Sequence, residues 1–171
     1  MKQKAFTFHS QNLKKHLTFI LSSHLYLSIK AYLCPTMEKY IFELNMKVRD
    51  YECDLQGIVN NANYQHYLEH TRHEFLTSVG ISFAKLHEQG VDPVVARINM
   101  AFKTPLKSGD EFVSKLYLKK EGIKYVFYQD IFRLPDMKVV IKSTVESVCV
   151  VNGRLSESAL FDETFAPYFH A

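Results

Sequence analysis

The residues best suited to chemistry lie between Arg49 and Leu76, around Asp54. Asp54 follows a segment with the pattern of a strand, and a helical pattern begins seven to nine residues after it. The free backbone N–H groups at the start of a helix favour developing negative charge. A carboxylate that faces such donors supplies what acyl transfer needs: a nucleophile or general base, opposite hydrogen-bond donors for the carbonyl oxygen.

Gly57 stands three residues after this carboxylate, where it would let the backbone approach a bulky ligand closely. The spacing Asp-x-x-Gly is also common in loops, where Asp54 would simply cap a turn and Gly57 would be an ordinary turn glycine. The residues alone therefore leave a catalytic and a purely structural interpretation open.

Three histidines on the predicted helix, His66, His70 and His73, have the spacing i, i+4, i+7 and share one face. This face points away from the apolar face, so we expect it to be exposed to solvent. A structural or catalytic zinc usually needs a closed or buried set of ligands with supporting partners. The spacing therefore predicts no metal site.

The elements that position these residues follow from hydrophobic periodicity. Residues 40–52 alternate with a period of two, which predicts a strand. Residues 64–79 carry apolar side chains at spacings of three and four residues, which predicts a long helix. Asn61 or Asn63 would cap its start, and Gly80 would end it. A further helical turn or two is expected at 82–89. Apolar runs between turn signals then predict antiparallel strands at 94–106, 111–120, 125–134, 139–151 and, after the Asn152-Gly153 hairpin signal, 154–160. This order predicts an α+β domain with a helix packed on a sheet.

The length of 171 residues suits one domain. The net charge of +3 comes from residues 1–36, which hold five lysines and no acidic residue, so the remainder is slightly acidic. This charge distribution argues against nucleic acid as a partner. The three cysteines, Cys34, Cys53 and Cys149, are widely spaced and favour a reducing compartment, so we expect a cytoplasmic protein.

Residues 1–36 are expected to form an N-terminal extension outside the fold, and 37–171 the folded domain. The apolar stretch Leu17–Ile29 is too short and too interrupted for a membrane span, and no membrane association is expected. Three interpretations of residues 1–36 stay open: a start assigned too early, with Met37 as the true first residue; a targeting segment; or a genuine extension.

The combined order of motifs resembles the 4-hydroxybenzoyl-CoA thioesterase branch of the hotdog superfamily. The segments that are similar to plant acyl-lipid and methylketone-synthase-type thioesterases are Arg49-Asp50-Tyr51-Glu52, Gly57-Ile58-Val59-Asn60-Asn61-Ala62 and Arg72-His73-Glu74-Phe75-Leu76. The resemblance covers about Glu38 to Val151. It implies a hotdog fold, in which an antiparallel β-sheet wraps around one long central α-helix, and hydrolysis of acyl-CoA or acyl-ACP thioesters without a metal or redox cofactor.

The resemblance also implies roles for individual residues. Asp54 matches the catalytic carboxylate, which either attacks the thioester carbonyl or activates a water. Asn61 matches the position whose backbone N–H polarises that carbonyl. Many bacterial relatives have His at this position, so Asn61 favours the plant-like subgroup. The substrate contacts would be Gly57, Ile58, Val59 and Tyr64, together with Glu69, which could instead be a surface glutamate or a second catalytic or orienting group.

Family members pair into homodimers or homotetramers with substrate sites between the subunits, so the resemblance implies such an oligomer here.

Two other functions stay open. A hotdog hydratase or dehydratase would pair its carboxylate with a catalytic histidine, and no histidine accompanies Asp54 in its loop. A non-catalytic module would bind acyl thioesters without turning them over.

Overall fold

The computed structural model describes residues 40–169; the extension at 1–36 lies outside this range. A six-stranded sheet has the order β1-β3-β4-β5-β2, and β6 pairs with β5. All of these pairings are antiparallel. The strands are β1 (Phe42–Lys47), β2 (Val91–Phe102), β3 (Glu111–Glu121), β4 (Lys124–Arg133), β5 (Val139–Val151) and β6 (Arg154–Ser156).

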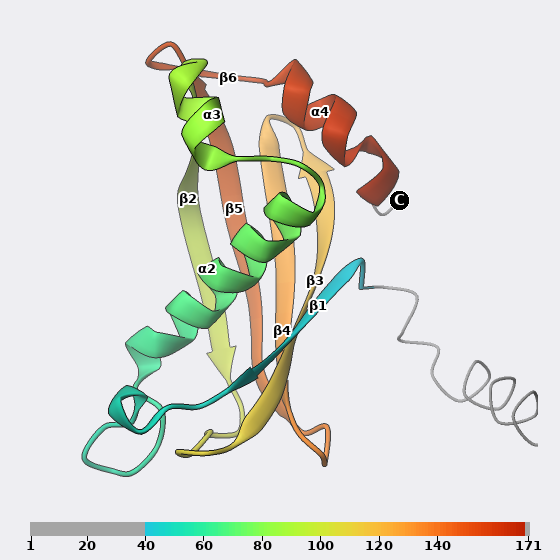
Figure 1. Cartoon of the computed structure of the whole chain (residues 1–171). Helices are drawn as coiled ribbons and strands as arrows, with labels where there is room; N and C mark the ends of the chain where they lie inside the picture. The colour runs from blue at the N-terminus through green and yellow to red at the C-terminus, as the bar shows by residue number, and fades with distance from the viewer. Residues whose placement is uncertain (1–39, 170–171) are drawn as a thin grey trace, which may run out of the picture. The chain divides into compact units, whose positions relative to one another are not determined.

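The long helix α2 (Asn61–Ser78) crosses one face of this sheet (Figure 1). Its buried residues recur at spacings of three and four, from Tyr64 to Leu76, which confirms the predicted helix and its inward face. The helix cap differs from the prediction: the side chain of Asn60, rather than that of Asn61 or Asn63, accepts a hydrogen bond from the Ala62 N–H at 3.0 Å. The short helix α3 (Phe83–Glu88) follows α2 as expected.

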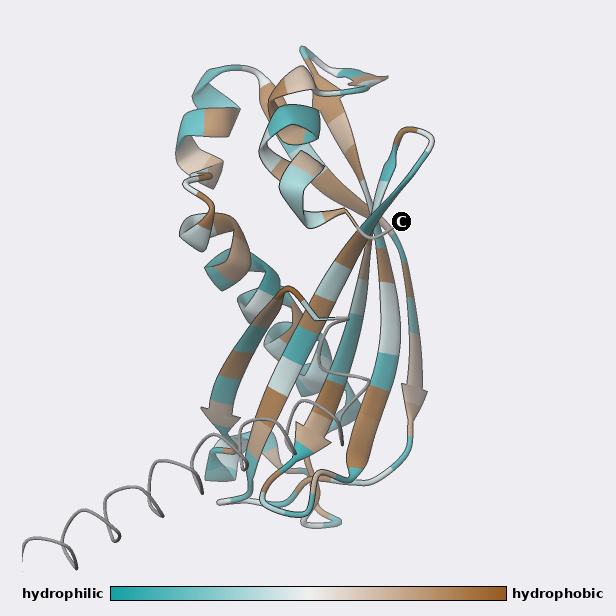
Figure 2. Cartoon of the chain, turned by 90° about the vertical axis from the view of Figure 1, so that its right-hand side faces the viewer, coloured by the Kyte–Doolittle hydropathy of each residue, from teal (hydrophilic) through white to brown (hydrophobic). Residues whose placement is uncertain are grey.

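The core lies between α2 and the sheet, in two clusters of buried side chains. One cluster surrounds the C-terminal half of α2 and includes Phe75, Leu116 and Phe127. The other surrounds the N-terminal half and includes Leu68 and Phe112. Figure 2 shows apolar and polar residues alternating along the strands, the pattern of a sheet with one face against a core. An antiparallel sheet around one long helix is the predicted architecture. No helix within residues 40–169 has the length and hydropathy to cross a membrane.

The predicted strand at 40–52 is wrong at its C-terminal end. β1 stops at Lys47, and the 3-10 helix η1 (Asp50–Glu52) follows. The cause is the side chain of Glu52, which turns back to accept a hydrogen bond from the backbone N–H of Arg49 at 2.7 Å. Alternation of residue types does not reveal such a side-chain contact.

The predicted strand at 154–160 is also too long. β6 ends at Ser156, and helix α4 (Ala159–Phe165) then begins, with η2 (Ala166–Tyr168) after it. Ser158 caps α4 by accepting a hydrogen bond from the Phe161 N–H. Phe161 and Phe165 are four residues apart and both are buried, so this segment follows helical rather than strand periodicity.

Asp162 fastens α4 to the sheet. Its carboxylate accepts hydrogen bonds of 2.6 Å from Lys120 Nζ and from the Tyr125 hydroxyl. These two bonds, that of Lys120 first, hold the pKa of Asp162 below its usual value. Folding therefore favours the ionised carboxylate, and its contribution to stability is present above the unfolded pKa and lost as the pH falls through the folded pKa.

We expect Asp162→Asn to lower the free energy of unfolding at pH 7, because the amide keeps the shape of the carboxylate but lacks its charge. The difference from the wild type should shrink toward about pH 3 and below. Urea unfolding at both pH values measures it. Glu163→Gln is the matched control, since Glu163 is an exposed neighbour on the same helix. A loss in the free energy of unfolding that is equal at both pH values would contradict the electrostatic explanation.

Candidate active site

A tight loop between η1 and α2 carries Asp54. An antiparallel bridge between Cys53 and Val59 closes the loop. Within it the Asp54 N–H donates to the Ile58 carbonyl, and the Gly57 N–H donates to the Asp54 carbonyl, both at 2.9 Å. Gly57 has φ +73°, a left-handed conformation that side chains disfavour, so glycine is needed for this turn. The loop thus holds the backbone of Asp54 from both sides.

The carboxylate of Asp54 is half-buried and partly constrained. Its Oδ1 accepts a hydrogen bond from the Gln56 N–H at 2.8 Å. No group within residues 40–169 donates to Oδ2. One oxygen therefore fixes the orientation of the carboxylate and the other is available to a substrate or a water.

Asp54 and Asn61 line the same pocket, which has a volume of about 430 Å³. The first turn of α2 satisfies its other donors: the Ala62 N–H reaches the side chain of Asn60, and the Asn63 N–H reaches the Asn60 carbonyl. Across the described part of the chain, the Asn61 N–H has no acceptor. The pocket thus combines a carboxylate with an available donor at a helix N-terminus. It is lined by Asp54, Gln56, Ile58, Val59, Asn61, Tyr64, Phe102, Lys103, Thr104 and Pro105.

Tyr64 lines this pocket with its ring. The hydroxyl accepts a hydrogen bond from the Leu106 N–H at 3.1 Å, and the ring meets that of Phe102 edge-on at 5.6 Å. Burial raises the pKa of Tyr64. The Val59 N–H also donates to the Leu106 carbonyl at 2.8 Å. Tyr64 and Val59 therefore join the Asp54 loop and α2 to the segment that follows β2.

Two of the predicted substrate contacts lie elsewhere. Gly57 shapes the loop without lining the pocket. Glu69 lines a different pocket, farther along α2, together with Arg72 and His73. A single chain therefore brings together Asp54, Asn61, Ile58, Val59 and Tyr64 at one site, and separates Glu69 from them.

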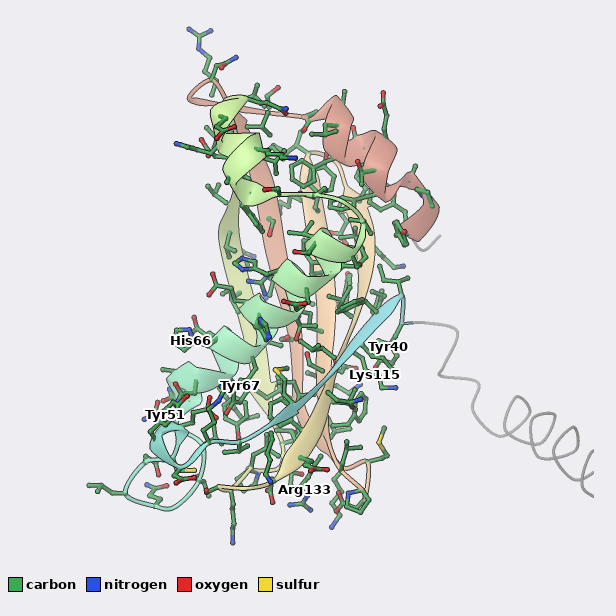
Figure 3. All side chains as sticks on the ribbon, in the orientation of Figure 1. Tyr40, Tyr51, His66, Tyr67, Lys115 and Arg133 are labelled. Carbon is green, nitrogen blue, oxygen red and sulfur yellow. The ribbon has the colours of Figure 1, made fainter. Side chains whose placement is uncertain are left out.

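Glu52 is the important residue near the site that the sequence did not single out. It is only 7% exposed. Its carboxylate accepts hydrogen bonds from the Arg49 N–H at 2.7 Å, from Arg49 Nη1 at 3.1 Å and from the Tyr67 hydroxyl at 2.7 Å. Burial first, and then the bond to Glu52, raise the pKa of Tyr67 well above its ordinary value. In Figure 3, Tyr67 lies beside β1, on the sheet side of α2.

The backbone of Glu52 also contacts the start of α2. Its carbonyl accepts from the Asn60 N–H at 2.9 Å and from Asn63 Nδ2 at 2.7 Å. Glu52 thus binds both the segment before Asp54 and the start of α2, which sets the position of one against the other. The signal in the sequence was a glutamate three residues after Arg49, a spacing that matters only once a helical turn is recognised there.

The three histidines lie on the exposed side of α2, as predicted. Figure 3 shows His66 on the side of α2 opposite Tyr67. His70 and His73 are near Glu74 and Glu69 respectively, at 3.9 Å. No set of side chains within residues 40–169 is arranged to hold a metal ion.

Residues 48–168 match the family model of the thioesterase-like superfamily, so the chain belongs to this superfamily. Its antiparallel sheet around α2 is the hotdog fold, as predicted. Among solved structures, the 1,4-dihydroxy-2-naphthoyl-CoA thioesterase of Synechocystis shares this fold with a TM-score of 0.69 and 13% identity, over 76% of this chain and 98% of that chain.

Two curated relatives are similar in sequence. A protein of Arabidopsis thaliana named as a chloroplastic acyl-acyl carrier protein thioesterase is 38% identical over 102 residues, which cover 59% of this chain and 54% of the relative. A putative esterase of Aquifex aeolicus is 32% identical over 114 residues, which cover 67% of this chain and 88% of the relative. This chain thus aligns with little more than half the length of the Arabidopsis protein.

Proposed function

We propose that this protein hydrolyses acyl-CoA or acyl-ACP thioesters to a free acid and a thiol, with Asp54 as the catalytic carboxylate. The observation that carries the proposal is that Asp54 lines the same pocket as Asn61, whose N–H has no acceptor among the described residues. Membership of the thioesterase-like superfamily and the name of the Arabidopsis relative support the class of reaction.

In the proposed mechanism the thioester carbonyl lies between the two groups. The Asn61 N–H donates to the carbonyl oxygen and stabilises the negative charge that develops there. The available oxygen of Asp54 then acts in one of two ways. It attacks the carbonyl carbon and expels the thiolate, leaving an anhydride that water hydrolyses, or it takes a proton from a water that attacks directly. Both routes give the same products.

A hydratase or dehydratase fits the pocket less well. No histidine is among the residues that line it, so Asp54 lacks the second proton-transfer group that this chemistry uses. Lys103 lies at the pocket and is a suitable contact for a phosphate of the carrier. This contact is compatible with either coenzyme A or the phosphopantetheine of a carrier protein.

Incubation with a panel of acyl-CoA and acyl-ACP thioesters, with thiol release as the readout, tests the proposal. We expect release from at least one series, and the profile gives the preferred chain and carrier. Binding of these thioesters without any release would instead identify the protein as a non-catalytic module.

We further propose that two copies of the chain pair through β2. Among the strands of residues 40–169, β2 pairs with β5 alone, and its outer edge at the end of the sheet has no partner strand within these residues (Figure 1). It is 12 residues long and exposes Val94, Val95 and Phe102. A long, apolar, unpaired edge is a template for another strand. A symmetric pair would cover it in both copies and continue the sheet across the dimer.

A charge on the edge strand tests the dimer. Val95 is 46% exposed, and Val95→Arg is expected to give a monomer, because it replaces an apolar side chain of the proposed contact with a charged one. Sedimentation velocity gives the mass. Leu155→Arg is the control, since Leu155 is an exposed apolar residue of β6, away from the proposed contact. A Val95→Arg protein that keeps the wild-type mass would exclude pairing through β2.

A further inference from the structure

A second pocket lies at the far end of α2, in the part of the fold that the catalytic proposal does not use. It has a volume of about 110 Å³ and runs between α2, α3, the sheet and α4. Figure 1 shows α3 and α4 at the end of the sheet where α2 finishes, whereas the Asp54 loop precedes the first turn of α2. We call this the tail pocket.

The floor of the tail pocket is aromatic. Phe127 of β4 and two residues of α4, Phe161 and Phe165, line it and are almost fully buried. The rings of Phe161 and Phe165 lie 5.1 Å apart, and Phe165 is 6.5 Å from Phe127. Because Asp162 binds Lys120 and Tyr125, α4 cannot move freely away from the sheet. The pocket therefore has a closed, fixed, apolar end.

The mouth of the tail pocket is at the edge of the sheet. Its β2 residues include Val94 and Val95, which are exposed beside the free edge of the strand, and Phe83 of α3 is partly exposed next to them. Polar groups of α2, Glu69 and Arg72, also border the pocket. An apolar chain could enter here and run toward the phenylalanine floor.

Within one chain the tail pocket and the Asp54 pocket are separate, because they share no lining residue. The α2 residues that line them, Asn61 and Tyr64 in one and Glu69 to Leu76 in the other, are five to 15 residues apart, or about 8 to 22 Å along the axis. Antiparallel pairing of two β2 strands removes this separation. If the strands overlap over their full length, Pro93 of one tail pocket lies opposite Met100 of the other copy, two residues from the Phe102 that lines that copy's Asp54 pocket.

We infer that the tail pocket of one copy receives the acyl chain of the thioester held by Asp54 of the partner, and that Phe161 and Phe165 of α4 limit its length. This inference rests on the proposed thioesterase function and on the β2 dimer. The occupant is an unbranched aliphatic chain, since the inner walls offer apolar side chains and a closed end. Each added methylene that no longer fits would lower the rate about tenfold or more.

Changes to the pocket end test the chain-length role. We expect Phe161→Ala to shift the optimum of kcat/KM over a series of saturated acyl thioesters toward longer chains by about two carbons or more. Phe161→Leu is a milder change of the same kind, in case the alanine variant does not fold. Val148→Phe, which adds a ring to the pocket wall, should shift the optimum toward shorter chains.

Leu160→Ala is the matched control on the same helix, because Leu160 is 43% exposed and does not line the pocket. Its profile should equal that of the wild type. Unchanged profiles in folded, active Phe161→Leu and Val148→Phe proteins would overturn the inference while leaving the thioesterase function intact. If the wild type hydrolyses no thioester in the series, the proposed function itself fails.

A mixed dimer tests whether the pocket acts across the interface. A chain carrying both Asp54→Asn and Phe161→Ala is purified together with a differently tagged wild-type chain. The one intact carboxylate then belongs to the wild-type chain, and the tail pocket facing it belongs to the altered chain. We expect the mixed dimer to show an optimum of kcat/KM that is shifted toward longer acyl chains, as in the Phe161→Ala protein. A wild-type profile from this mixed dimer would place the acyl chain within a single copy and overturn the inference.

Discussion

Asp54→Asn is expected to lower the rate of thioester hydrolysis by at least about a thousandfold. The amide has nearly the size and shape of the carboxylate, and its oxygen can still accept the hydrogen bond from the Gln56 N–H. The loop should therefore keep its geometry. An amide can neither attack a thioester nor take a proton from water, so both proposed routes stop. Thiol release with the best substrate of the panel measures the effect.

The control for this variant is Asp50→Asn, four residues earlier in η1, where the carboxylate accepts a hydrogen bond from the Ser108 hydroxyl rather than lining the pocket. It should retain most of the activity. Mass and unfolding curves of both variants should match the wild type. Undiminished thiol release by a folded Asp54→Asn protein would remove Asp54 from the mechanism.

Glu52→Ala is expected to lower the free energy of unfolding by about 3 kcal/mol. The substitution removes the acceptor for the Arg49 N–H and for the Tyr67 hydroxyl, and the hydroxyl is then left buried without a partner. It also leaves space between η1 and α2. Equilibrium unfolding in urea measures the loss. Because Glu52 positions the Asp54 loop against Asn61, activity should fall even where the protein stays folded.

Tyr67→Phe separates the parts of this network. It deletes one hydrogen bond to Glu52 and keeps the ring, so the expected loss is only about 1 kcal/mol. A Glu52→Ala protein no less stable than Tyr67→Phe would show that the carboxylate does not brace η1. The alanine variant should also lose more activity than the phenylalanine variant, since only the former frees the Arg49 N–H.

The fold was predictable wherever one periodicity extends over a whole element. The apolar stripe of α2 and the alternating strands β3, β4 and β5 satisfy this condition. The prediction failed where a single side-chain contact ended an element. Glu52 curls the chain into η1, and Ser158 starts α4, and each does so through a bond to the backbone that residue patterns do not encode.

The site was predictable in part for a similar reason. Asp54, Asn61, Ile58, Val59 and Tyr64 are close in sequence, and a turn followed by a helix brings them to one pocket. Phe102 and Lys103 come from the end of β2, so their approach depends on the pairing of distant strands. Glu52 was missed because its role comes from burial, which the alternating pattern of residues 40–52 did not suggest for it.

The position of the helix cap has a consequence for how the site can change during evolution. The proposed donor at Asn61 is a main-chain amide, so its presence depends on where α2 begins and not on which side chain stands at 61. Asn60 sets that start by bonding the Ala62 N–H. Position 61 is thus free to vary to any residue except proline, which has no N–H, without loss of the donor, whereas a change at 60 that moved the first turn would remove it. The residue that determines a main-chain donor of this kind is therefore the one before it in the sequence.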